Sequence, residues 1–287
     1  KMFLFIIDQI FTNEIQTPIV LMHGIINDKS HMNNIKKWLE ESIQGIYIKN
    51  CEVGNGIEDS FWMPMNDQIA ELALCIQNDK QLLNGFYGLG YSQGGYLLRA
   101  YLEQYNQPKM KRLVTLTAPL AGYFCGRHYP CGTYLLPDFL NNIAPELIYS
   151  EFGQQLAGAA AYWRDPYNMD LFEQFSSNLA DLDNKVVHNE TYRQNFIGLE
   201  KLVMFGSPKD GAICPWSSAW FGAFGENDET VLSMEQREEY NQDNFGLKTL
   251  NEAGKVKIFD SGLEHAQNML NEELIKVKVV PELKDEC

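Results

Sequence analysis

The 287-residue sequence lacks any apolar run long enough to cross a bilayer, so we expect neither a membrane-spanning helix nor stable membrane insertion. The apolar stretch at its start, residues 2–7, is interrupted by Asp8. That stretch is too short for the hydrophobic region of a signal peptide, and no small-residue cleavage site follows it. Two interpretations of residues 1–12 stay open: the remnant of a signal segment, or an edge strand.

Basic residues are also scarce, because 23 lysines and arginines stand against 38 aspartates and glutamates, which gives a net charge of −15. We therefore expect no nucleic-acid partner, since such partners require a positive surface. The five histidines are scattered, and neither C-x-x-C nor H-x-x-x-H occurs, so we predict no metal site and no cofactor. Internal repeats are absent too, and nothing in the sequence indicates an oligomeric state.

Six cysteines are too few for a disulfide scaffold in a chain of this length. Cys125 and Cys131 bracket a short loop with glycine, histidine and proline, and a disulfide there would stabilise a segment with little core of its own. Asn189 begins the only N-glycosylation sequon, and together these features favour a protein of the secretory pathway. Spacing does not pair the other cysteines, which are Cys51, Cys75, Cys214 and Cys287.

Short apolar runs alternate with stretches of helical spacing, which predicts βαβ units and a mostly parallel sheet in one domain spanning residues 1–287. The predicted strands are residues 19–22, 46–53, 86–89, 112–117, 202–205 and 256–259. The predicted helices are residues 34–43, 67–76 and 95–102, with a terminal helix from near His265 towards Ile275. With 45% hydrophobic residues, the chain can fill one sizeable core.

Gly90-Tyr91-Ser92-Gln93-Gly94 is the most informative motif of the chain. It follows a strand-like run and precedes a helix-like stretch, and a serine in that setting forms the nucleophile elbow of α/β-hydrolases. The strained turn lifts the serine hydroxyl clear of the sheet, and glycines flank it because larger side chains would clash. We therefore predict an α/β-hydrolase fold, with helices on both faces of the sheet and Ser92 as the nucleophile.

Residues 122–200 interrupt the strand–helix alternation and are rich in apolar and aromatic side chains. A helical insertion at this point of a hydrolase sheet is the usual place for a cap, so we predict a helical cap over residues 122–200. Most of its apolar side chains would pack the cap onto the sheet, and a subset would line a groove for an acyl chain. Leu147, Ile148 and Leu156 are the groove candidates, because helical spacing places them on one apolar stripe.

A serine nucleophile needs a base, and the base needs an acid that fixes its tautomer, in the chain order Ser, Asp or Glu, His. His265 follows the last predicted strand, whereas His188 lies in a polar stretch beside the sequon. Asp210 follows the penultimate strand, at the sheet end where open α/β sheets place their sites. Asp260 is close to His265 in sequence and is the weaker candidate; Asp228 and Glu229 lie in an acidic, solvated loop. The predicted triad is Ser92, Asp210 and His265.

An oxyanion hole needs two backbone N–H groups. One is that of Gln93, the residue after the nucleophile, and the other should come from the loop after the first core strand. In that loop we choose Ile25. His23 precedes the elbow in the chain, so we interpret it as a residue that shapes the loop and not as the base.

Taken together, these residues resemble the palmitoyl-protein thioesterase family of lysosomal α/β-hydrolases, from Pro18 to about Asn268. The similarity rests on the blocks Val20-Leu21-Met22-His23-Gly24, Gly90-Tyr91-Ser92-Gln93-Gly94-Gly95, Ala161-Tyr162-Trp163-Arg164-Asp165-Pro166, Asn189-Glu190-Thr191-Tyr192 and Trp220-Phe221-Gly222. It implies the same triad, cleavage of long-chain fatty-acyl thioesters, a glycosylated soluble protein and a lysosomal address. Cys125 and Cys131 match what looks like a family disulfide.

Two departures qualify the resemblance. Cys75 matches a family cysteine whose expected partner region, residues 103–106, contains no cysteine, so that bridge is expected to be absent. Residues 210–216 and 244–250 look more like the family's second branch, which resembles the first in fold and chemistry but prefers acyl-CoA-type or smaller thioesters.

Our leading hypothesis is a fatty-acyl thioester hydrolase, lysosomal or secreted, that acts through an acyl-enzyme on an S-acylated protein, an S-acylated peptide or acyl-CoA. A lipase or carboxylesterase that cleaves oxygen esters would use the same residues. A catalytically silent protein that carries lipid in the groove is a third hypothesis, which the intact triad candidates disfavour.

Overall fold

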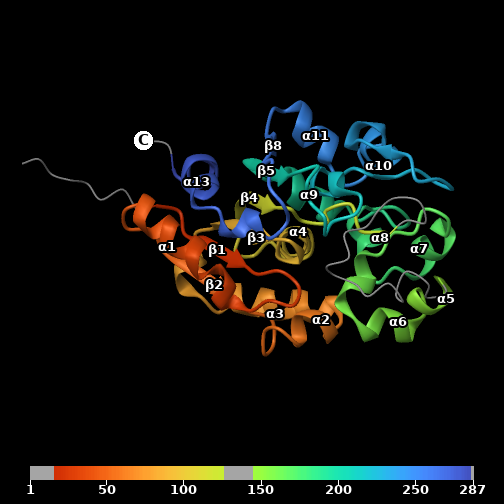
Figure 1. The fold of residues 1–287 in the computed structure, drawn as a ribbon, viewed down its shortest axis with the longest axis horizontal. Coiled ribbons are helices and arrows are strands. Elements are labelled where there is room, and N and C mark those ends of the chain that lie inside the picture. The colour runs from red at the N-terminus through yellow and green to blue at the C-terminus, as the bar shows by residue number, and fades with distance from the viewer. Residues whose placement is uncertain (1–15, 126–144, 286–287) are drawn as a thin grey trace, which may run out of the picture.

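A six-stranded parallel sheet forms the centre of the protein (Figure 1). The structure, a computed structural model, describes residues 16–125 and 145–285. The strand order is β2-β1-β3-β4-β5-β8, and every neighbouring pair is parallel. The strands are β1 (Ile19–Met22), β2 (Ile48–Cys51), β3 (Phe86–Tyr91), β4 (Met110–Leu116), β5 (Lys201–Gly206) and β8 (Val256–Asp260). The predicted α/β-hydrolase architecture is confirmed.

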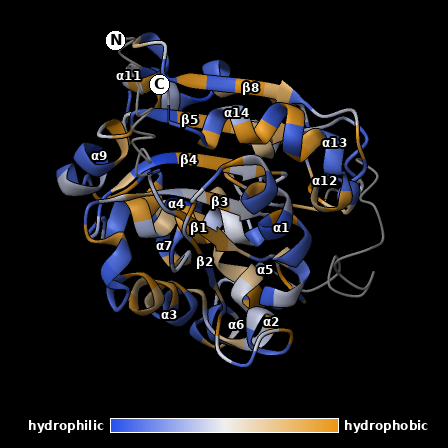
Figure 2. Cartoon of the chain, turned by 90° about the vertical axis from the view of Figure 1, so that its left-hand side faces the viewer, coloured by the Kyte–Doolittle hydropathy of each residue, from blue (hydrophilic) through white to orange (hydrophobic). Residues whose placement is uncertain are grey.

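The sequence of β1 explains how the sheet is buried on both faces. All four of its residues are buried, and Val20 and Met22 belong to one core cluster while Ile19 and Leu21 belong to the other. Successive side chains of a strand point to opposite faces, so a strand covered on both sides must be apolar throughout. Figure 2 shows the strands stacked from β8 to β2, with helices packed around them.

Two groups of helices cover the two faces. The Val20 face packs against α3 (Met65–Gln77) and α4 (Gln93–Gln104), and the Ile19 face packs against α1 (Asn33–Ser42) and the C-terminal helices. Between β5 and β8 lie a small antiparallel pair and two helices, which are β6 (Ala223–Phe224), β7 (Val231–Leu232), α10 (Glu238–Asn241) and α11 (Leu247–Glu252). Short 3₁₀ turns lie in the connections: η1 (Lys29–Met32), η2 (Lys80–Leu82), η5 (Trp216–Trp220) and η6 (Met234–Gln236).

The continuous C-terminal helix predicted from His265 is wrong. The chain instead forms α12 (Gln267–Leu270), α13 (Glu272–Leu274), the π-helical turn η7 (Ile275–Val279) and α14 (Val280–Leu283). Asn271 interrupts the helix because its backbone is extended and its side chain accepts a hydrogen bond from the Leu274 N–H at 2.8 Å. A side chain that caps a new helix in this way also ends the preceding one.

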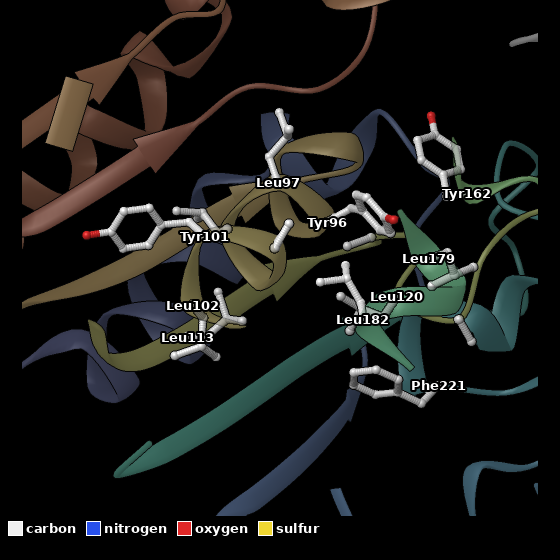
Figure 3. Close-up of a cluster of buried hydrophobic side chains, with 14 of the residues drawn as sticks. Tyr96, Leu97, Tyr101, Leu102, Leu113, Leu120, Tyr162, Leu179, Leu182 and Phe221 are labelled. Atoms are coloured by element: carbon white, nitrogen blue, oxygen red, sulfur yellow. The ribbon is translucent and has the colours of Figure 1, made fainter. Parts of the chain in front are cut away.

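Between β4 and β5 the chain forms a group of short helices over residues 145–200, which we call the cap segment. Its elements are α5 (Pro145–Ile148), α6 (Glu151–Leu156), η4 (Gly158–Tyr162), α7 (Met169–Phe175), α8 (Leu179–Leu182) and α9 (Glu190–Ile197). Figure 3 shows Leu179 and Leu182 of the cap segment close to Tyr96 of α4. The rings of Tyr96 and Tyr162 lie 5.1 Å apart, so apolar packing joins the cap segment to the helix that follows the elbow.

Buried charges also join α4 to the cap segment. The Arg99 guanidinium donates to Glu103 Oε1 at 2.7 Å and to Asp183 Oδ1 at 2.8 Å, and all three side chains are inaccessible to solvent. Arg237 donates to the second oxygen of Asp183, also at 2.8 Å. Charges so deeply buried are tolerated only when paired, so Asp183 links α4 to the β6–α10 region through the cap segment.

A disulfide joins Cys51, at the end of β2, to Cys75 in α3. The spacing of these cysteines did not pair them, and Cys75 bonds to Cys51 and not to the 103–106 region. Cys125 also takes part in a disulfide, whereas its predicted partner Cys131 lies outside the described residues, as do Cys287 and residues 1–15. The Cys125–Cys131 pairing therefore stays a prediction.

Candidate active site

Ser92 lies on a sharp turn between β3 and α4, as the motif predicts. Its backbone has φ 52° and ψ −127°, an unusual conformation for a residue with a side chain, and its N–H donates to Leu116 O at 2.8 Å. Strain of this kind is stored at functional sites. A Cβ on Gly94 would clash with the carbonyl oxygens of Met22 and His23, so the close approach of α4 to the end of β1 requires glycine there.

His265 connects Ser92 to Asp210 through hydrogen bonds. Its Nε2 lies 3.0 Å from Ser92 Oγ, and its Nδ1 lies 2.8 Å from Asp210 Oδ2. The three residues follow β3, β5 and β8, and parallel strands bring their carboxyl ends to the same edge of the sheet. An arrangement of this kind can move a proton from a serine hydroxyl to an imidazole whose tautomer is fixed by a carboxylate.

The second oxygen of Asp210 is held by the backbone. Asp210 Oδ1 accepts hydrogen bonds from the N–H groups of Ala212 and Ile213, at 2.8 and 3.0 Å. Its carboxylate therefore has a fixed rotation, with one oxygen on these two donors and the other on His265.

The alternative base and acids lie elsewhere. His188 is exposed, and its Nε2 lies 2.9 Å from Glu190 Oε2. Asp260 Oδ1 accepts from the Gly262 N–H at 2.8 Å and so stabilises its own turn. Asp228 is exposed, as the acidic loop predicts.

The loop after β1 lies against the elbow. A Cβ on Gly24 would lie only 3.0 Å from Ser92 Cβ. The Gly24 carbonyl is 2.9 Å from His23 Nδ1, and the Val53 N–H points to His23 Nε2 at 3.4 Å, so the neutral ring carries its proton on Nδ1. Burial lowers the pKa of His23 below its usual value and favours that neutral form. Because a trans peptide directs its C=O and N–H oppositely, His23 also fixes the direction of the Ile25 N–H.

A pocket that opens to solvent lies beside Ser92. Its walls come from the loops after β1, β4 and β5 and from η4 of the cap segment. The lining residues are Ile25, Ser92, Pro119, Tyr123, Ala159, Tyr162 and Ile213. The pocket is mostly apolar, so it suits an apolar group placed next to the serine.

Two of the groove candidates from the sequence, Leu147 and Ile148, are not among the residues that line this pocket. Leu147 is 49% exposed, and Ile148 is partly buried against the core; for Leu156 the structure describes no side chain. Two residues that do line the pocket, Pro119 and Ile213, could have been found from the sequence by their position, because each lies a few residues beyond the end of a sheet strand.

Asn189 caps the N-terminus of α9, and its Oδ1 accepts hydrogen bonds from the Thr191 and Tyr192 N–H groups at 3.0 and 3.2 Å. Within residues 16–125 and 145–285, no group of three or more His, Cys, Asp or Glu side chains could hold a metal ion. None of the helices described in those ranges has the length and apolar character needed to cross a bilayer.

The sequence of the chain is similar to those of known proteins. A sequence model described as palmitoyl protein thioesterase matches residues 18–265. Palmitoyl-protein thioesterase 3 of Dictyostelium discoideum is 33% identical over 258 residues, 89% of this chain and 87% of that protein. Palmitoyl-protein thioesterase 1 of Caenorhabditis elegans is 32% identical over 260 residues, 88% of this chain and 87% of that protein. A Drosophila melanogaster protein named lysosomal thioesterase PPT2 homolog is 34% identical over 252 residues, which are 84% of this chain and 82% of that protein.

A solved structure supports the fold. A Pyrococcus furiosus esterase aligns with 94% of this chain and 82% of its own, with a TM-score of 0.50 and 12% sequence identity. At that identity the likeness concerns the arrangement of strands and helices alone.

Proposed function

Because the chain belongs to the palmitoyl protein thioesterase family, we propose that it is a serine hydrolase that cleaves fatty-acyl thioesters. The observation that carries the proposal is the position of His265, 3.0 Å from Ser92 Oγ and 2.8 Å from Asp210 Oδ2. This is the distance range in which a base can take the proton of a nucleophile. The serine would otherwise be too weak a nucleophile for a thioester.

In the proposed reaction Ser92 Oγ attacks the thioester carbonyl carbon and gives its proton to His265 Nε2. The N–H groups of Ile25 and Gln93 stabilise the negative charge that develops on the carbonyl oxygen. The intermediate then expels the thiolate, which takes the proton from His265, and an acyl-serine remains. Water attacks the acyl-serine with His265 as base, and the fatty acid leaves as Ser92 recovers its proton. Asp210 keeps the imidazole in the reactive tautomer throughout.

The apolar pocket beside Ser92 is the proposed start of the acyl-chain site. Each CH₂ group that it buries would contribute roughly 0.8 kcal/mol. We therefore expect kcat/KM to rise with acyl length and to level off where the pocket ends. Leu147, Ile148 and Leu156 stay candidates for an extension of the site into the cap segment.

Assays with Ser92→Ala test the proposed function. Wild-type protein should hydrolyse palmitoyl-CoA or an S-palmitoyl peptide faster than the matched oxygen ester. The rates on the two thioesters show whether the protein prefers CoA or a peptide cysteine as the leaving group. Ser92→Ala should lose on the order of 10⁶ in kcat, as expected for a triad nucleophile. A variant that keeps a tenth of the activity would overturn the assignment of Ser92. Preference for the oxygen ester would indicate a lipase or carboxylesterase, and failure to react with a fluorophosphonate would indicate a silent lipid carrier.

We also propose a secretory-pathway address, lysosomal or secreted. Several relatives are named lysosomal thioesterases, and the Cys51–Cys75 disulfide is typical of an oxidising compartment. Glycosylation of Asn189 and pairing of Cys125 with Cys131 belong to the same proposal. Mass mapping of protein from secretory expression would detect both, and unmodified Asn189 with free thiols at the two cysteines would contradict them.

A further inference from the structure

Ser60 lies in the short helix α2 (Asp59–Trp62), beside the loop after β1, and is buried. Its Oγ accepts a hydrogen bond from the Ile26 N–H at 2.8 Å and donates one to Ile57 O at 2.8 Å. The other end of the same peptide is also held, because Ile25 O accepts from Asn27 Nδ2 at 2.7 Å. The peptide that follows the Ile25 N–H is thus fixed at both its oxygen and its nitrogen.

The main chain of Ser60 contacts the other half of the predicted oxyanion hole. Its carbonyl oxygen accepts from Gln93 Nε2 at 2.8 Å. Gln93 is the first residue of α4, directly after Ser92, and its backbone N–H is the second predicted donor. Ser60 therefore makes two contacts with the predicted oxyanion hole. Its hydroxyl bonds to the loop that contains Ile25, and its carbonyl oxygen bonds to the side chain of Gln93.

Neighbouring side chains complete this polar network. Gln68 accepts from Gln93 Nε2 at 2.9 Å and donates to the carbonyls of Ser60 and Met63, at 3.2 and 2.8 Å. The Tyr162 hydroxyl of the cap segment donates to Gln93 Oε1 at 3.0 Å, so both ends of the Gln93 amide have partners. Buried networks whose members are all satisfied are rigid, because moving one member leaves others unpaired in a medium that cannot replace the bonds.

We propose that Ser60 is a positioning residue that holds the Ile25 and Gln93 N–H groups at the spacing that the transition-state oxyanion requires. The inference rests on the proposed thioesterase function. A donor stabilises the oxyanion only within a narrow distance range, and loss of one donor costs on the order of 10²–10³ in kcat. A donor that is displaced but still present should cost less, so we expect about a tenfold to hundredfold loss.

The test replaces Ser60 by alanine and measures two quantities. Ser60→Ala should lower kcat on palmitoyl-CoA about tenfold to hundredfold with little change in KM, because the ground state does not need the two donors. The inhibition constant of an alkyl trifluoromethyl ketone, whose adduct with Ser92 places an oxyanion between the donors, should rise by the same factor. Gln93→Met keeps the backbone donor but removes the link to Ser60, and should shift both quantities in the same direction.

Tyr101→Phe is the matched control. It removes a buried hydroxyl that donates to Pro108 O at 2.7 Å, further along α4, and should leave kcat and the inhibition constant unchanged. Wild-type kcat in Ser60→Ala, or a loss of kcat without weaker ketone binding, would refute the positioning role while leaving the thioesterase intact. If Ser60→Ala fails to fold, Gln93→Met decides in the same way. A wild-type chain without thioesterase activity would instead refute the proposed function, and this inference with it.

Discussion

Replacement of Asp210 by asparagine should inactivate the enzyme through the wrong histidine tautomer. In the structure one carboxylate oxygen accepts from the Ala212 and Ile213 N–H groups, and the other faces His265 Nδ1. An asparagine has only one oxygen, and two backbone donors require it on their side. The NH₂ group must then face His265 Nδ1, which forces the imidazole proton onto Nε2, and Nε2 can no longer accept a proton from Ser92.

The expected loss follows from that tautomer. In a serine protease, the corresponding aspartate-to-asparagine change keeps the geometry and lowers kcat by about 10⁴. At about 1.36 kcal/mol for each factor of ten, this is roughly 5.4 kcal/mol of transition-state stabilisation. The change is nearly isosteric, so the thermal midpoint should move by only a few degrees.

Release of CoA thiol from palmitoyl-CoA by purified Asp210→Asn protein measures the effect. Asp260→Asn is the matched control, because Asp260 is the last residue of the neighbouring strand β8 and accepts a hydrogen bond from the Gly262 N–H. The control should keep nearly full activity. If Asp210→Asn retained more than a tenth of the wild-type kcat, or if Asp260→Asn were the more damaging change, the acid would be misassigned.

Two further predictions concern stability and protonation. Replacing Cys51 and Cys75 by serine opens a loop with a sequence separation of 24, so the chain-entropy model predicts a loss of about 3.5 kcal/mol in the free energy of unfolding. Urea unfolding measures this loss, and a variant as stable as the wild type would contradict the prediction. For His23, burial lowers the folded-state pKa below the unfolded value of 6.5, so its contribution to stability is fully present above 6.5 and is lost as pH falls towards the lower value. An NMR titration of the His23 ring with a midpoint at or above 6.5 would refute this.

Strands β1, β3 and β5 were predictable because a parallel strand covered on both faces has to be an apolar run. The edge strands β2 and β8 contain lysine and are only partly covered, so their pattern is weaker. β1 coincides with the predicted residues 19–22, and the other five strands differ from the prediction by no more than two residues at either end. β6 and β7 are two residues each, too short to leave a periodic pattern. The C-terminal helix was misjudged because apolar spacing continues through Asn271, and only the side-chain cap in the folded chain reveals the break.

For the site, chain order and strand ends narrow the choice of residues for each predicted role. Ser92, Asp210 and His265 each follow a strand of the sheet, and the sequence leaves few rivals at those positions. Ser60 could not be found in this way, because its contacts depend on where α2 packs against two distant loops. The pairing of Cys51 with Cys75 likewise depends on β2 meeting α3 in the folded protein.

The buried ion pair between Arg99 and Asp183 bears on how a substrate enters. Lifting the cap segment away from α4 would leave Arg99 in the interior without Asp183, and breaking one buried pair costs about 3–5 kcal/mol. That cost holds a lifted arrangement to about one molecule in a hundred or fewer. We therefore expect a substrate to reach Ser92 through the opening that the folded chain already presents, without movement of the cap segment away from α4. Turnover should then rise smoothly with substrate concentration, without a jump at the point where an amphiphilic substrate forms micelles.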